Sequence, residues 1–263
     1  MAASTDLADR LLRLTTDVLR DLAVGHAPDL QLPRVLGGHP VGPDARADLA
    51  FTLGLLHEAG VTEVAGLSCR DVALDVVRTL DGPATHSFYS YRVAETLLRF
   101  GGLDDNEALA GWDRDDLTNA EAAIDSSGML DALADGTLPK NYAVVLTRCE
   151  YDRMRLGRLP DESVLDGLLT QVAQLLGRLD TGWWDDFGGA NFDMYTPDVY
   201  LFAEPFADRL GDVWTDGFRR VAADIADLAT PGGAISWGRS TGALGIVMTV
   251  ELGATVLARG LTD

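Results

Sequence analysis

The chain has 263 residues, 47% of them hydrophobic, which is enough for a domain with a substantial core. Its 41 acidic and 21 basic residues give a formal net charge of −20, which excludes a typical nucleic-acid-binding protein because phosphate binding requires a basic surface. Residues 1–12 do not resemble a signal peptide, and no apolar run approaches the roughly 20 residues of a membrane span. Cys69 and Cys149 favour free thiols in a reducing compartment. We therefore expect a cytoplasmic protein without a membrane partner.

Apolar residues recur at helical spacing through almost the whole chain. The clearest stripes lie within residues 7–22 and 165–179, where leucine or valine returns every three or four positions. Further helices are predicted near 44–59, 68–80, 87–100, 118–133, 138–157, 197–210, 214–229 and 240–258. The nearest approach to a strand, Val61 to Leu67, is short, so the sequence predicts an all-α fold.

Several helix boundaries are marked by capping residues, proline or glycine. Thr118 and Glu121 have the spacing of a capping box, which predicts a helix start. Thr196 before Pro197 predicts another start, and Pro205 predicts a kink in the helix that follows. Three helices are predicted to end just before glycine, at Gly60, Gly101 and Gly211.

The ten predicted helices pair into five hairpins, whose first helices begin near Thr5, Ser68, Leu117, Asp161 and Val213. Their spacing of roughly fifty residues is typical of a repeated helical unit. We expect residues 1–263 to form a single α/α-toroid domain of about five hairpins, with the second helices lining the inside. An open solenoid is the alternative. A six-hairpin barrel would need one more unit, so we expect a truncated barrel, a five-unit version of it, or one that is completed by another subunit of a homo-oligomer.

The most informative segment is the glycine-rich stretch Gly182–Tyr195, which crowds two tryptophans, three carboxylates, an amide and a phenol between two predicted helices. A long loop in a compact domain is uncommon unless it is functional or disordered, and this one has too many aromatic residues for disorder. Flat aromatic faces beside carboxylates suit a ligand with apolar C–H faces and many hydroxyls, which describes a sugar. In a toroid, the loop inside each hairpin lies on one rim, where the residues suited to chemistry gather.

Four motifs in the second half occur in the order known from one bacterial protein family. They are Asn141-Tyr142 at a helix start, Gly182-Trp183 followed by Asp185, Phe192-Asp193-Met194-Tyr195-Thr196-Pro197, and Gly238-Arg239-Ser240. The chain resembles this family, whose function is unknown and whose (α/α)6-toroid fold is similar to that of glycosidases and uronate-processing enzymes. The resemblance covers about residues 138–240. Lys140 and Thr196 replace two asparagines of the family pattern, so the resemblance implies the fold more directly than it implies catalysis.

Asp193, Asp185 and Asp186 are the candidate catalytic residues. Asp193 lies between Phe192 and Tyr195, and aromatic neighbours would raise its pKa and favour a general acid, whereas the alternative role is a helix cap. In an inverting hydrolase a second carboxylate, about 6.5–9.5 Å away, activates water. Asp185 is preferred over Asp186 for this role because the resemblance falls on it; the alternative for both is a solvated loop.

The candidate substrate-binding residues are His86, Asn141, Tyr142, Trp183, Tyr195, Trp237 and Arg239. Trp183 and Trp237 suit stacking on a sugar ring, with a place in the core as the alternative. Arg239 suits bidentate binding of a carboxylate, with a structural ion pair as the alternative. A lone histidine such as His86 is more often a capping or core residue.

These features predict a carbohydrate-active enzyme, a glycoside hydrolase acting on an oligosaccharide. Arg239 and the helix N-termini on the rim favour a uronate-containing sugar. One alternative is a lyase on the same fold, with Tyr195 or Tyr142 as the base and Asn141 against the uronate carboxylate. Another is a non-catalytic helical scaffold. No cofactor is expected, and no metal either, because the four histidines lack the spacing of metal ligands.

Overall fold

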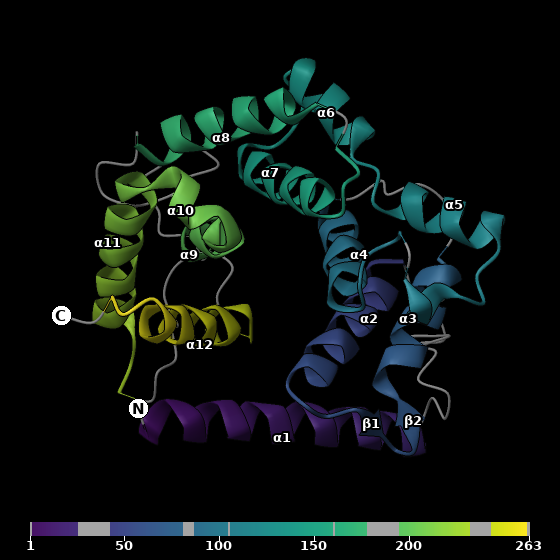
Figure 1. Cartoon of the computed structure of the whole chain (residues 1–263). Helices are drawn as coiled ribbons and strands as arrows, with labels where there is room; N and C mark the ends of the chain where they lie inside the picture. Colours follow the sequence, from purple (N-terminus) through teal and green to yellow (C-terminus); the bar gives the residue numbers. More distant parts are fainter. Residues whose placement is uncertain are drawn as a thin grey trace. The chain divides into compact units, whose positions relative to one another are not determined.

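A computed structural model describes residues 2–25, 43–80, 87–104, 106–159, 161–177, 195–231 and 243–261 (Figure 1). In these ranges almost all regular structure is helical, which confirms the predicted all-α class. The strand-like stretch near Val61 forms the short antiparallel strands β1 (Glu63–Val64) and β2 (Leu67–Ser68). No helix in the described ranges has both the length and the apolar character needed to cross a bilayer.

The chain divides into two compact units, which are described separately. Unit 1 comprises Met1–Asp131 and Asp152–Pro160, and unit 2 comprises Ala132–Tyr151 and Asp161–Asp263. The helices of unit 1 are α1 (Ala2–Gly25), α2 (Pro43–Glu58), α3 (Cys69–Arg78), α4 (Ser87–Arg99), η2 (Glu107–Leu109), α5 (Arg114–Ala123) and the start of α6 (Ser127–Ala134).

The core of unit 1 forms where α2 packs against both α3 and α4. Residues from all three helices are fully buried there, namely Ala47, Leu53, Val76, Val93 and Leu97. The start of α3 is fixed by Ser68, whose side chain accepts a hydrogen bond from the backbone N–H of Asp71 at 3.2 Å. The predicted helices 44–59, 68–80 and 87–100 are therefore confirmed to within a few residues.

The predicted helix 118–133 is wrong in two respects. It consists of two helices, α5 and α6, and α5 begins at Arg114 instead of Thr118. Asp113 is the capping residue, because its Oδ1 accepts from the backbone N–H groups of Asp115 and Asp116 at 2.8 and 2.9 Å. Thr118 instead lies within α5, where its hydroxyl donates to the carbonyl of Arg114. The sequence contains two neighbouring capping patterns, Asp113 with Asp116 and Thr118 with Glu121. The structure forms the capping box of the first.

Unit 2 contains most of α7 (Lys140–Arg155), followed by α8 (Glu162–Gly177), α9 (Tyr195–Phe202), η3 (Glu204–Phe206), α10 (Ala207–Leu210), α11 (Asp212–Leu228) and α12 (Ala243–Ala258). Helix α11 packs against α8, α9 and α12, and α9 also packs against α12 (Figure 1). At Pro205 a kink was predicted, and the structure shows a complete interruption, since α9 stops at Phe202 and the proline lies in the separate helix η3. Gly60, Gly101 and Gly211 follow helix ends as predicted, each with a positive φ.

Aromatic residues fill the core of unit 2 between α9 and α11. Trp214 and Phe218 stack with ring centroids 4.7 Å apart, and the Trp214 indole donates to the carbonyl of Tyr200 at 2.9 Å. All three side chains are almost completely buried.

One face of α12 is apolar and exposed to solvent. Ile246, Val247 and Leu257 each keep more than half of their surface accessible, and Val250 keeps 36%. Among the larger side chains of this helix whose burial the structure describes, Leu252 is buried. In the described part of the chain, α12 packs against α9 and α11.

Candidate functional site

Three of the predicted site residues lie in the described part of the chain. Asn141 and Tyr142 are in the first turn of α7, and Tyr195 is the first residue of α9. The structure therefore brings these three to the starts of two helices of the same unit. The other predicted site residues lie outside the described ranges: His86, Trp183, Asp185, Asp186, Asp193, Trp237 and Arg239.

The start of α7 has no acidic residue and follows a proline. Pro139 offers no side-chain oxygen as a cap, and its carbonyl accepts from the backbone N–H of Tyr142 at 3.0 Å. Lys140 is exposed and is the only lysine of the chain. The positive end of the helix dipole and an ammonium group thus coincide at this turn.

Asn141 is buried at the same turn, with 9% of its surface exposed. Its side-chain Oδ1 is inaccessible to solvent and has no hydrogen-bond partner in the part of the chain that the structure describes. A buried polar group without a partner costs roughly 1–3 kcal/mol, so such a group calls for an explanation.

Two further residues connect α7 to the rest of unit 2. Arg148 lies seven residues after Asn141, which places it two helical turns along approximately the same face. The ring of Tyr151 contacts that of Phe206 in η3, with centroids 5.7 Å apart.

The first turn of α9 holds a largely buried carboxylate. Asp198 is 7% exposed and follows Thr196, which is 2% exposed. An acid in the first turn is stabilised by the helix dipole. Because α9 begins at Tyr195, Thr196 lies inside the helix and not at the predicted capping position.

Helix α12 contributes one carboxyl group, Glu251, the only ionisable residue among its sixteen. Its side chain reaches solvent, yet the surrounding protein raises its pKa by desolvation. The positive charge of Arg148 opposes this shift, and the negative charge of Glu204 adds to it. Glu251 is therefore electrically coupled to both α7 and η3.

Glu204 is itself held in place by Arg259, just after α12. The guanidinium donates to Oε1 and to the backbone carbonyl of Glu204, both at 2.8 Å. It also donates to Asp208 and lies over the ring of Trp214, 5.5 Å from the centroid. These bonds fix the C-terminal end of α12 against η3 and α10.

Arg148, Asp198 and Glu251 were not among the residues predicted from the sequence. Glu251 had a recognisable signal, because a single carboxylate in an otherwise apolar helix requires a local reason. Asp198 and Arg148 had no such signal, since charged residues are common on both sides of them in the sequence.

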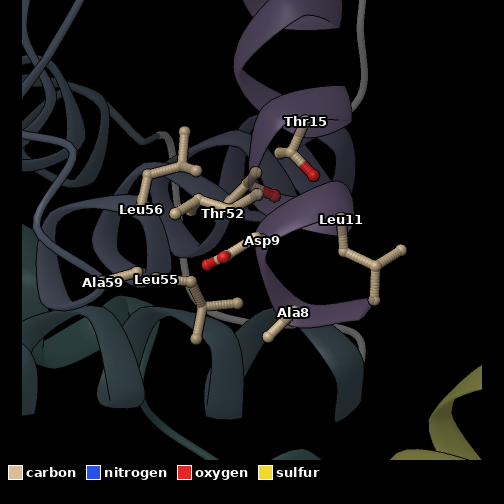
Figure 2. A pocket seen from close by; sticks show the side chains of 9 residues that line it. Ala8, Asp9, Leu11, Thr15, Thr52, Leu55, Leu56 and Ala59 are labelled. Atoms are coloured by element: carbon tan, nitrogen blue, oxygen red, sulfur yellow. The ribbon is translucent and has the colours of Figure 1, made fainter. Parts of the chain in front are cut away.

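Two surface grooves lie away from these residues. One, of about 570 Å3, separates α1 from α2 in unit 1 and is lined mainly by apolar side chains, with Asp9 directed across it toward Leu55 (Figure 2). The other, of about 540 Å3, lies along α8 and α10 in unit 2, beside the ion pair of Asp166 and Arg209. Of the predicted site residues that the structure describes, Asn141, Tyr142 and Tyr195, none lines either groove.

Among the described residues, no group of three or more His, Cys, Asp or Glu side chains is arranged to hold a metal ion. Comparison of the chain with protein-family models, with curated proteins and with solved structures gives no match in any of the three.

Proposed function

We propose that the protein is a carbohydrate-active enzyme, a glycoside hydrolase that acts on an oligosaccharide or a uronate-containing sugar. The main support is Glu251, a lone carboxyl group on an apolar helix, whose pKa is raised by desolvation. The pKa shift has the direction that a general acid requires, because glycosidases raise the pKa of the carboxyl that donates the proton.

Hydrolysis requires a second carboxyl group besides the proton donor. In the proposed mechanism Glu251 or Asp193 protonates the leaving oxygen, and Asp185 or Asp186 activates water. Asp198 is a further carboxylate on α9, the helix that packs against α12.

Side chains at the helix starts would bind the sugar. Asn141, Tyr142 and Tyr195 offer an amide and two phenols at the first turns of α7 and α9. Groups of this kind donate to and accept from sugar hydroxyls. Trp183 and Trp237 would stack on the sugar, while Arg239 and His86 complete the proposed set of binding residues.

The test is an activity assay on a panel of neutral and uronate-containing oligosaccharides. New reducing ends report hydrolysis, and ultraviolet absorbance of an unsaturated product reports a lyase. Glu251→Gln and Asp193→Asn are compared with Asp227→Asn, which removes an exposed carboxylate of α11 and should leave turnover unchanged. Loss of the proton donor should lower the rate by about 10²–10⁴-fold.

Each outcome has a definite meaning. Hydrolysis that falls in one of the two active-site variants, but not in the control, supports the proposal and identifies the acid. An unsaturated product would show that the protein acts as a lyase and not as a hydrolase. A wild-type protein that cleaves nothing on the panel, yet binds sugars, would favour the scaffold.

A further inference from the structure

We propose that the first turn of α7 is a binding site for an acidic sugar, with the backbone N–H groups and Lys140 on the carboxylate and Asn141 on a neighbouring hydroxyl. This inference rests on the proposed function and specifies its substrate class. It depends on two independent observations, the charge at this turn and the state of the Asn141 side chain.

The charge at the turn favours an anion. Helix N-termini present unpaired N–H donors and a positive dipole, which together bind carboxylate and phosphate groups. In α7 no acidic side chain occupies the first turn, and the preceding Pro139 has no side-chain oxygen with which to cap it, although its carbonyl accepts from the N–H of Tyr142. Lys140 adds a full positive charge in a chain whose net charge is −20.

The Asn141 carboxamide indicates that the ligand also carries a hydroxyl. In a helix the Cα–Cβ bond tilts toward the N-terminus, so a side chain at the second position leans toward the exposed N–H groups. The buried Oδ1 of Asn141 lacks a partner among the described residues, although it needs a donor. A hydroxyl can supply that hydrogen bond, whereas a carboxylate by itself cannot.

A sugar acid combines both groups at the required scale, because its carboxylate lies beside ring hydroxyls. The carboxylate would receive the charge-assisted bonds, which are about twice as strong as neutral ones. A neutral sugar would retain only the weaker hydrogen bonds. The site should therefore distinguish a uronate from the corresponding hexose by affinity.

The probe pair is sodium glucuronate and glucose, titrated calorimetrically into the full chain at equal ionic strength. We expect glucuronate to bind the wild type about tenfold more tightly than glucose. Asn141→Leu removes the amide at similar size and should weaken glucuronate binding by about fivefold or more. Lys140→Gln should weaken glucuronate but not glucose. The matched control is Asn119→Leu, the same change at an exposed position of α5, which should leave binding unaltered.

Unfolding in urea separates a binding role from a structural one. Replacing an unpartnered buried amide by leucine should leave the stability of the ligand-free protein unchanged or increase it. A large loss of stability in Asn141→Leu would instead assign the side chain to the fold. In that case Lys140→Gln still tests the site, because the exposed lysine can be replaced without loss of packing.

Two results would overturn the site: equal affinity for the two sugars, or undiminished glucuronate binding in both α7 variants. The proposed function fails separately. If the protein cleaves neutral oligosaccharides and shows no preference for uronates, the α7 site is rejected and the proposed hydrolase activity is supported. If the protein binds glucuronate selectively through Asn141 but cleaves no substrate, the α7 site is supported and the proposed hydrolase activity is rejected.

Discussion

The phenol ring of Tyr200 on α9 lies directly against Gly217 on α11, where no side chain separates the two helices. A Cβ atom built at position 217 would lie 2.6 Å from Cε1 of that ring, closer than real Cβ contacts allow. The glycine therefore sets the spacing of the two helices, and the close approach lets Tyr200 remain fully buried beside Phe218.

Gly217→Ala should consequently destabilise the protein, although alanine is the better helix former. Helix propensity favours the change by about 1 kcal/mol, whereas overpacking typically costs about 1–3 kcal/mol and the rigid ring cannot move aside easily. Gly167→Ala on α8 is the control, since nothing lies within 4 Å of its Cβ position. Urea unfolding should show a net loss for the first variant and a gain for the second. Equal gains in both would refute the tight contact.

The pKa of Glu251 predicts how its stability contribution varies with pH. Desolvation raises this pKa in the folded state, so folding favours the protonated carboxyl. The stabilisation that comes from the protonated Glu251 carboxyl is fully present below the pKa of this group in the unfolded chain. It is lost as the pH rises through the higher pKa of the group in the folded protein. Glu251→Gln should thus be more stable than the wild type at pH 7, with a smaller difference at pH 4. Paired urea titrations at both pH values measure this, with Asp227→Asn as the charge control. A constant difference at the two pH values would contradict the raised pKa.

Arg259→Met should loosen the end of α12. The change removes hydrogen bonds to Glu204 and Asp208 and the contact with the Trp214 ring, while the methionine keeps part of the packing. Charge-assisted bonds of this kind suggest a loss of about 1–3 kcal/mol. Arg219→Met is the comparison, because its 3.7 Å pair with Asp216 is exposed and should contribute within about 0.5 kcal/mol. Thermal melts of the two variants test the difference, and equal melting temperatures would speak against a clamp.

Asp193→Asn should abolish turnover and leave the fold intact. The amide is nearly isosteric with the acid but cannot donate the dissociable proton, so general-acid catalysis worth about 10²–10⁴-fold is lost. Circular dichroism, melting temperature and turnover are measured on one preparation. A destabilised variant that keeps its turnover per folded molecule would mean that Asp193 only supports the start of α9.

Most of the described helices could be predicted from the helical spacing of apolar residues and from the proline and glycine residues that mark helix ends. Pro205 and the glycines after three helices mark real ends because their backbone preferences are local. The predicted helix start at Thr118 was wrong because the sequence contains a second capping pattern just before it, Asp113 with Asp116. Residue spacing alone favours neither pattern over the other. The structure forms the earlier of the two, with the Asp113 side chain accepting from Asp115 and Asp116 and the Asp116 side chain accepting from the backbone of Asp113.

The candidate site was only partly predictable, for a different reason. Asn141 and Tyr195 were predicted from motifs beside expected helix starts, and the structure places them at the starts of α7 and α9. Glu251 was not predicted because no motif links this single acid of the predicted helix 240–258 with the other candidate residues. The electrical coupling of Glu251 to Arg148 joins residues about a hundred positions apart, and no local pattern encodes such a pair.

The exposed apolar face of α12 also bears on how copies of the chain behave toward one another in solution. Ile246, Val247 and Leu257 form a surface that water does not favour, while the net charge of −20 repels one copy from the next. Charge repulsion reaches only about 10 Å at 0.1 M salt and disappears as carboxylates gain protons. Colloidal stability in this molecule therefore depends on the balance between long-range charge repulsion and short-range attraction through exposed apolar side chains such as these, and we expect it to be lowest in acidic, high-salt conditions.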